Sequence, residues 1–153
     1  MSSETEIAML ALKTALDASA SLPAARRDPV FEDVFEALGA PDSGYSTVLA
    51  LRHGDPVETT RRFGAGPQAY ELVRNAELEF YVAGAEGAGL NAAFDGGLSA
   101  IHAAIEADRT LGGAVVAAEI VEQPDLGTDS AGSKAVLTAV VRVQLTYVSL
   151  RSY

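Results

Sequence analysis

The 153-residue chain contains no cysteine. It therefore has no disulfide bond, no thiolate zinc site and no cysteine nucleophile, and cysteine usage says nothing of its compartment. It also lacks an uncharged apolar run near the ~20 residues that a membrane-spanning helix needs. Its first six residues lack the basic segment of a signal peptide. We expect a protein that depends on its apolar core, does not span a membrane and is not exported by that route.

Basic residues are scarce as well. The chain has 11 lysines and arginines against 21 aspartates and glutamates, which gives a net charge of −10. Such a surface repels the phosphate backbone, which disfavours sequence-specific DNA binding. The length is that of one ordinary domain, and the 48% hydrophobic content suffices for a single core. We predict one domain over residues 1–153.

The first half of the chain predicts two helices and three strands. A capping residue at Ser3 begins a helix that should end near Ala20, ahead of Leu22-Pro23. A short helix is expected over residues 30–38, inside an otherwise irregular connection. Residues 46–53 and 57–63 are expected to form a hairpin around Gly54-Asp55-Pro56, and a third strand is expected over residues 70–82.

The second half predicts a long amphipathic helix from Leu90 to Thr110 and two more strands, over residues 114–123 and 136–148. The final strand alternates apolar and polar residues, and its length suggests that it outruns its neighbours. Residues 123–133 between these strands are small and polar, which indicates a mobile loop. The predicted fold is α+β, with a mostly antiparallel sheet of about five strands and two main helices packed on it. The apolar stripe of the long helix consists of Leu90, Phe94, Leu98, Ile101 and Ile105.

Few residues suggest chemistry. The glycine-rich turn from Gly84 to Gly89 follows a strand and precedes a helix, as a phosphate-binding turn does, but no lysine follows and Glu86 would oppose a phosphate. An ordinary turn is favoured, and a small α/β nucleotide- or coenzyme-binding enzyme domain remains the alternative. His102 and Glu106 share a helix face without a third ligand nearby. We therefore expect no catalytic residue, no metal site and no cofactor.

The most basic segment is Arg61-Arg62, which Arg52 and Arg74 on neighbouring predicted strands would extend into a patch. Such a patch would contact DNA or an acidic neighbour. The alternative is cross-strand pairing within the sheet. The acidic partners available for this pairing are Glu58, Glu71 and Glu77.

The order of helix, three strands, helix and two strands resembles the tail terminator proteins of long-tailed phages and of phage-derived gene transfer agents. The resemblance covers nearly the whole chain, and residues 105–113 are most similar to the gene-transfer-agent branch. It is carried by the strand AELEFYV at residues 76–82, the helix at residues 98–113, the strand Ala118-Glu119-Ile120 and the strand VRVQLTY at residues 141–147.

This resemblance implies a structural protein without an active site. Six copies would form a ring that caps the tail tube and joins it to the head-side connector or stopper protein, with a central passage for DNA. Assembly would take place in the bacterial cytoplasm, and the ring would become part of the neck of a phage-like particle. The expected subunit or tube contacts are Asp125, Asp129, Lys134, Tyr147, Arg151, Tyr153, Arg61 and Arg62.

Overall fold

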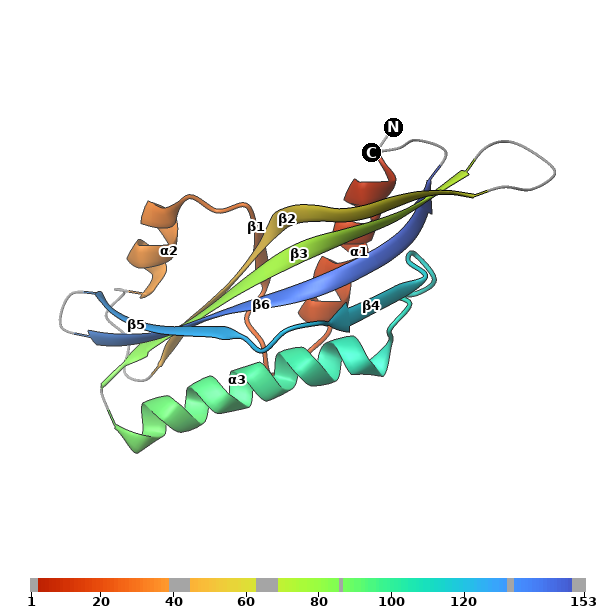
Figure 1. Ribbon diagram of the computed structural model, residues 1–153. Helices are drawn as coiled ribbons and strands as arrows, with labels where there is room; N and C mark the ends of the chain where they lie inside the picture. The colour runs from red at the N-terminus through yellow and green to blue at the C-terminus, as the bar shows by residue number, and fades with distance from the viewer. Residues whose placement is uncertain (1–2, 39–44, 63–68, 86, 132–133, 150–153) are drawn as a thin grey trace.

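A computed structural model describes residues 3–38, 45–62, 69–85, 87–131 and 134–149 of the chain (Figure 1). These residues form three helices and six strands. None of the described helices is long and apolar enough to cross a membrane. The elements are α1 (Glu4–Asp17), β1 (Ala25–Arg27), α2 (Phe31–Leu38), β2 (Ser46–Arg62), β3 (Ala69–Gly84), α3 (Ala88–Ala107), β4 (Ala117–Ile120), β5 (Asp125–Ala131) and β6 (Lys134–Ser149).

One sheet contains all six strands, in the order β1-β2-β3-β6-β4, and β5 pairs with the other end of β6. Only β1 and β2 run parallel, and the other pairs are antiparallel. The α+β class and the mostly antiparallel sheet are confirmed, with one more strand than expected. The final strand does not outrun its neighbours, because β3 is equally long and pairs with β6 from Tyr70 opposite Ser149 to Gly84 opposite Ala135.

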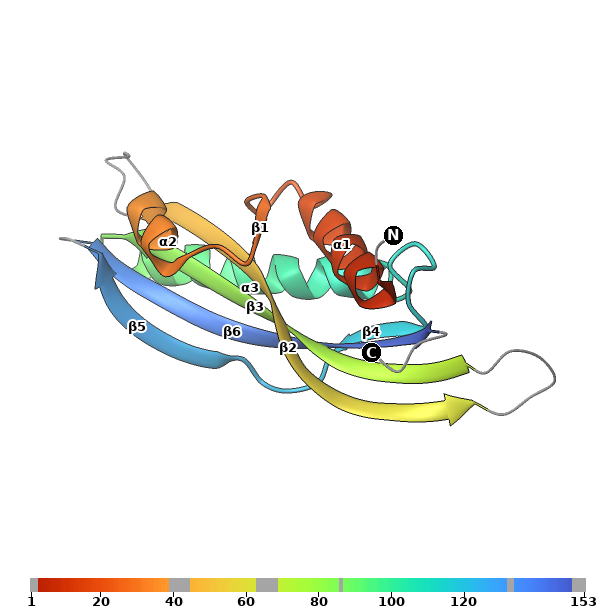
Figure 2. The same cartoon turned by 90° about the horizontal axis from the view of Figure 1, so that it is seen from above.

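The helices cover the two faces of the sheet unequally. α1 and α3 pack against one face, where the main core includes Leu49, Leu78 and Phe80. α2 packs on the other face at one end only, where Val34 and Leu38 join a smaller cluster. Among the described elements no helix lies over the rest of that second face, which is turned toward the viewer on the right of Figure 1 and toward the lower edge of Figure 2. We call this second face, beyond α2, the open face.

The two long helices follow from local signals. The Ser3 hydroxyl accepts a hydrogen bond from the Glu6 backbone N–H at 3.2 Å, so α1 begins where the capping pattern indicates. α1 ends at Asp17, earlier than expected, and the Asp17 carboxylate accepts a hydrogen bond from the Ala25 N–H at 2.7 Å. In α3 the expected stripe is confirmed at four positions, and Leu98 is half-buried. The four buried residues are Leu90, Phe94, Ile101 and Ile105.

Two expected breaks are strands instead. β2 runs on through Gly54-Asp55-Pro56, and the register against β3 shifts between His53 and Pro56 and again between Pro56 and Glu58. The predicted turn is therefore a bulged stretch, where a proline without a backbone donor is tolerated. The predicted mobile loop is also wrong over β5, which pairs with β6 from Asp125 opposite Val140 to Ala131 opposite Lys134. Small polar residues gain backbone pairing there although they have little apolar surface to bury. Residues 132–133 lie outside the described residues.

Candidate functional surface

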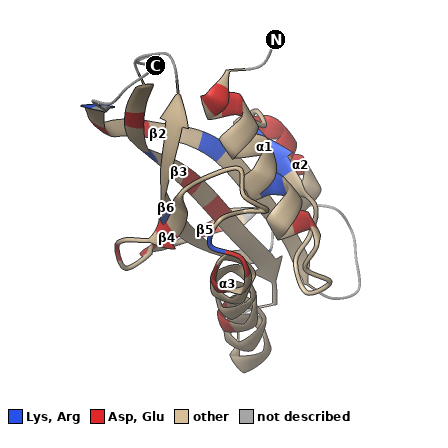
Figure 3. Ribbon diagram, turned by 90° about the vertical axis from the view of Figure 1, so that its right-hand side faces the viewer, with Lys and Arg blue, Asp and Glu red and all other residues tan. Residues whose placement is uncertain are grey.

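The open face collects the acidic residues of the sheet. Because side chains alternate along a strand, the pairing registers place every second residue on this face. All of the aspartates and glutamates that the described registers pair across the sheet fall on it, and Figure 3 shows acidic positions recurring along β3. Among the residues whose side chains are described, the basic ones on this face are Arg26, Arg52, Lys134 and Arg142. The acidic ones are Glu58, Glu71, Glu77, Glu79, Glu119, Asp125 and Asp129.

Arg142 of β6 is the centre of an ion-pair network on this face. Its guanidinium lies 2.9 Å from the Asp125 carboxylate, 3.3 Å from that of Glu122 and 3.8 Å from that of Glu77. The hydrogen bond to Asp125 raises the pKa of Arg142. One cation thus ties β5 and the segment before it to β3 across β6, while three carboxylates around one guanidinium leave the surroundings net acidic.

A second network joins the open face to the segment before α2. Arg52 of β2 forms an ion pair with Glu79 of β3 and donates a hydrogen bond to the Pro29 carbonyl at 2.7 Å. The Tyr81 hydroxyl donates to the same carboxylate at 3.2 Å. Burial, together with the neighbouring Glu79 charge, raises the pKa of Tyr81 to about 12. The tyrosine therefore stays neutral at physiological pH.

The predicted arginine patch is not one surface. Arg52 is committed to Glu79 on the open face, whereas Arg61 and Arg74 lie on the opposite face, near the end of the β2–β3 hairpin. Arg62 is the last residue of β2. Cross-strand pairing does occur at Arg52, but its partner is Glu79 and not one of the three expected acidic residues, Glu58, Glu71 and Glu77. Residues 55–61 of β2 are all exposed, and we call residues 55–62 of β2 with residues 69–75 of β3 the arm.

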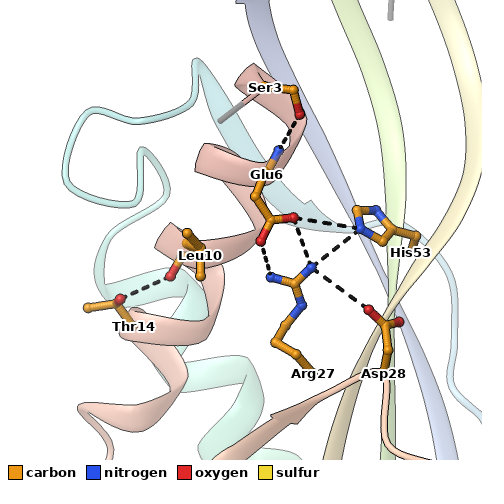
Figure 4. Close-up of polar contacts among 7 residues, drawn as sticks. All are labelled: Ser3, Glu6, Leu10, Thr14, Arg27, Asp28 and His53. Carbon is orange, nitrogen blue, oxygen red and sulfur yellow. Dashed lines mark hydrogen bonds and ion pairs between the residues drawn. The ribbon is translucent and has the colours of Figure 1, made fainter. Parts of the chain in front are cut away.

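A third polar cluster joins α1, β1 and β2 (Figure 4). The Arg27 guanidinium donates two hydrogen bonds to the Glu6 carboxylate, at 2.9 and 3.1 Å, and lies 3.3 Å from His53 Nε2. The bond from Arg27 holds the pKa of Glu6 below its ordinary value. Arg27 Nε is buried without a hydrogen-bond partner among the described atoms. The Glu6 carboxylate binds Arg27, while the Glu6 backbone N–H donates to the Ser3 hydroxyl, so the cluster holds α1 against the edge of the sheet.

The glycine-rich turn after β3 has a packing role. A side chain at Gly84 would lie 2.4 Å from the Tyr45 ring, and one at Gly89 would lie 2.1 Å from the Tyr45 hydroxyl. Gly87 has a φ of +144°, which suits glycine. Tyr45 thus lies against the turn and accounts for two of its glycines. Residue 86 lies outside the described residues.

The structure separates the expected contact residues. Asp125 and Asp129 lie on β5 at the sheet margin, and Lys134 begins β6 beside the end of α2, where its ammonium group lies 3.5 Å from the Leu38 carbonyl. Tyr147 belongs to the core instead: it is 2% exposed, and its hydroxyl lies 2.6 Å from that of Thr5. Its side chain points under α1 because odd-numbered residues of β6 face the helices. Arg151 and Tyr153 lie outside the described residues.

Sequence reasoning did not identify the networks around Arg142 and Arg27. Glu6 and Arg27 are 21 residues apart, and Arg142 is 17 residues from Asp125, so no local spacing marks either pair. Glu77 and Arg142 each lie in a strand that the sequence predicts, but alternation within each strand does not give the register that places them opposite each other.

A cavity of about 330 Å³ lies between α3 and the segment that joins β4 to β5. Its walls are mainly apolar and include Leu98, Ile101 and Val141, with His102 and Glu122 also lining it. His102 Nε2 is 4.0 Å from the Glu106 carboxylate, and both side chains are at least half exposed. Within the described ranges no three histidine, aspartate or glutamate side chains are arranged to hold a metal ion.

The sequence matches no model of a known protein family and no curated protein. Any proposal for the function therefore rests on the geometry of the sheet, on its charges and on its uncovered surfaces.

Proposed function

We propose that this chain is a structural protein of a phage or gene-transfer-agent particle, which assembles in the bacterial cytoplasm into a hexameric ring. The ring caps the tail tube, joins it to the head-side connector or stopper protein and leaves a central passage for DNA. The open face of each sheet lines the passage, and α1 and α3 lie on the outside. The resemblance of the sequence to tail terminators suggests this assembly.

The distribution of charge on the sheet is the observation that carries the proposal. Among the residues whose side chains are described, seven acidic and four basic residues belong to the open face, while the paired strands present no carboxylate on the helix-covered face within the described registers. A sheet with one free face commonly exposes polar residues there. The seven acidic residues make this face more than merely polar, because they create a negative surface that repels phosphate.

An acidic wall suits a passage that DNA must cross without adhering. Protein–DNA affinity comes largely from basic groups that displace counterions from the phosphates. Each of six open faces around an axis would carry more acidic than basic residues, and their negative potentials would add. DNA would therefore slide through the ring, and no sequence would be preferred.

Native mass spectrometry tests the ring, and negative-stain images test for a central passage. We expect a six-fold mass and a ring with an opening. A protein that stays monomeric at all concentrations, also when tail tubes are present, would contradict the proposal.

A charge substitution tests the lining. Glu71→Lys and Asp129→Lys change acids of the open face that make no ion pair with a described side chain. We expect rings of this double variant to retain DNA in a gel-shift assay, with binding that weakens steeply as salt rises. Asp95→Lys with Glu106→Lys, on exposed positions of α3, is the control with the same change in net charge. Equal retention by both double variants would place the open face away from the DNA.

A further inference from the structure

The sheet has two lateral margins that no described strand covers. On one side, β1 pairs with β2 only at Leu49, Ala50 and Leu51, so the outer edge of β2 in the arm has no strand beside it. On the other side, β4 and β5 each pair with β6 and have no described strand on their outer edges. Unpaired strand edges present backbone donors and acceptors that readily accept another strand.

Apolar side chains are exposed at both margins. Val57 on the arm is 50% exposed, whereas Val116, Val121 and Leu126 on the opposite margin are 56%, 40% and 67% exposed. An isolated surface valine needs no explanation, but apolar groups that follow unpaired strand edges are typical of contact surfaces. A strand or subunit that covered either margin would therefore remove exposed apolar surface from water.

The two margins are also complementary in charge. Residues 110–133, which contain β4 and β5, include Glu119, Glu122, Asp125 and Asp129 and no lysine or arginine. Residues 57–62 of the arm contain one acidic residue, Glu58, and two basic ones, Arg61 and Arg62, so this edge is net positive. Contact between two β4–β5 margins would bring acidic segments together, whereas contact between the arm of one copy and the β4–β5 margin of another would not. Arg61 lies on the helix-covered face and Glu119 and Asp129 on the open face, so the attraction acts between the margins as a whole and not through an ion pair of these residues.

The strand directions allow this contact. β2 and β6 both run antiparallel to β3, so they share a direction, and β4 and β5 run opposite to β6. In a ring whose copies are related by rotation, β2 of one copy therefore meets β4 or β5 of the next as an antiparallel neighbour. Strands in closed sheets tilt by roughly 35–45°, which shifts each copy along its neighbour.

We propose that the outer edge of β2 in the arm, residues 57–62, pairs with the β4–β5 margin, residues 117–131, of a second copy of this chain. Head-to-tail repetition makes one continuous sheet around the passage and leaves the open faces inside. This interface rests on the proposed ring, because only a closed head-to-tail assembly covers both margins of every copy.

Cysteine cross-linking tests the interface cleanly, because the chain has no cysteine. Thr59→Cys marks the arm, and each of Glu119→Cys, Val121→Cys and Thr128→Cys marks one level of the opposite margin. A flexible bismaleimide tolerates the unknown register. We expect at least one pairing of Thr59→Cys with these three, within one chain, to give a ladder of covalent species up to six chains on a denaturing gel.

The single-cysteine variants fix the polarity of the contact. Thr59→Cys alone should give no covalent dimer, and an equimolar mixture of Thr59→Cys with the matching second variant should stop at two chains. Thr59→Cys combined with Ser99→Cys on the exposed side of α3 is the control and should give no ladder. A strong dimer from Thr59→Cys alone would show that two arms meet, which overturns the proposal.

Native mass spectrometry of the same samples separates the two hypotheses. Hexamers that form without any cross-link between the arm and the three positions overturn this interface and leave the ring in place. A strictly monomeric wild-type chain overturns both.

Discussion

The phenyl ring of Phe80, on β3, occupies the space that a side chain at Gly97 of α3 would need. A Cβ atom at Gly97 would lie 2.1 Å from Phe80 Cζ, and the Phe80 ring is itself held by Phe94, with the ring centroids 5.9 Å apart. The neighbouring Gly96 is exposed, and a Cβ there would meet nothing within 4 Å. Only one of the two adjacent glycines is required by packing.

Alanine at these two positions should therefore have opposite effects. Gly97→Ala forces a buried ring to move, and overpacking of this kind costs about 1–3 kcal/mol, more than the ~1 kcal/mol that alanine gains over glycine in a helix. Gly96→Ala should give only the stabilisation of about 1 kcal/mol that alanine provides over glycine in a helix. Thermal unfolding measures both, and an increase in melting temperature for Gly97→Ala would contradict the close packing.

The pairing of Glu6 with Arg27 should make stability depend on pH. The hydrogen bond from Arg27 holds the pKa of Glu6 below the ordinary 4.5, so this bond stabilises the fold fully above that pH. The stabilisation is lost as the pH falls through the lowered value. Glu6→Gln should reduce the free energy of unfolding at pH 7, and its difference from wild type should shrink on acidification below 4.5.

Urea titrations across this pH range measure the effect, with Glu4→Gln as control. Glu4 lies in the same first turn of α1 and shares the favourable helix dipole, so the two variants differ chiefly in the contact with Arg27. Equal pH profiles for the two variants would mean that the ion pair contributes nothing.

Asp108 should organise the turn that follows α3. Its carboxylate accepts hydrogen bonds from the Gly112 N–H at 2.7 Å and from the Thr110 N–H and hydroxyl at 3.2 and 3.0 Å. Backbone N–H groups, that of Gly112 above all, lower the pKa of Asp108. The turn includes Leu111 with a φ of +49°. Asp108→Ala should lower the melting temperature at neutral pH.

The loss should be smaller at acidic pH, since protonation of Asp108 weakens the same hydrogen bonds in the wild-type chain. Hydrogen exchange adds a local measure: amide protection at Thr110 and Gly112 should fall more than protection in β3. An unchanged exchange pattern would show that the turn is held by its glycines alone.

Tyr147 should contribute to the stability of the subunit and not to assembly. Its buried hydroxyl lies 2.6 Å from that of Thr5, so Tyr147→Phe removes one hydrogen bond, worth about 1 kcal/mol. Native mass spectrometry should give the same oligomer for this variant as for wild type. A stable but disassembled Tyr147→Phe protein would return Tyr147 to the contact surface.

The sequence predicts the elements with strong periodicity best. The stripe of Leu90, Phe94, Ile101 and Ile105 repeats along one helix face, and buried and half-buried residues alternate in β6 from Ala139 to Ser149. Local periodicity therefore indicates both elements. The short helix over residues 30–38 is also found, as α2. These elements bury enough apolar surface for the pattern to show.

Elements held by backbone pairing were missed. β5 contains Gly127, Asp129 and Ser130, which predict a loop, yet it lies against the long edge of β6. β1 has only three residues and depends on β2 for its pairing. The open face could not be identified for the same reason, because its acids lie on four strands, and only the registers place them together.

The two register shifts in β2 have a consequence for the side chains beyond them. Each shift adds one unpaired position opposite β3, so the first reverses the facing of the strand and the second restores it. With both shifts kept, loss of a single residue near Gly54 would turn Arg61 toward the open face and Glu58 toward the helix side, whereas loss of two would keep every residue in phase. The length of this short segment, more than its composition, therefore sets the sign of the charge that the arm presents to each side.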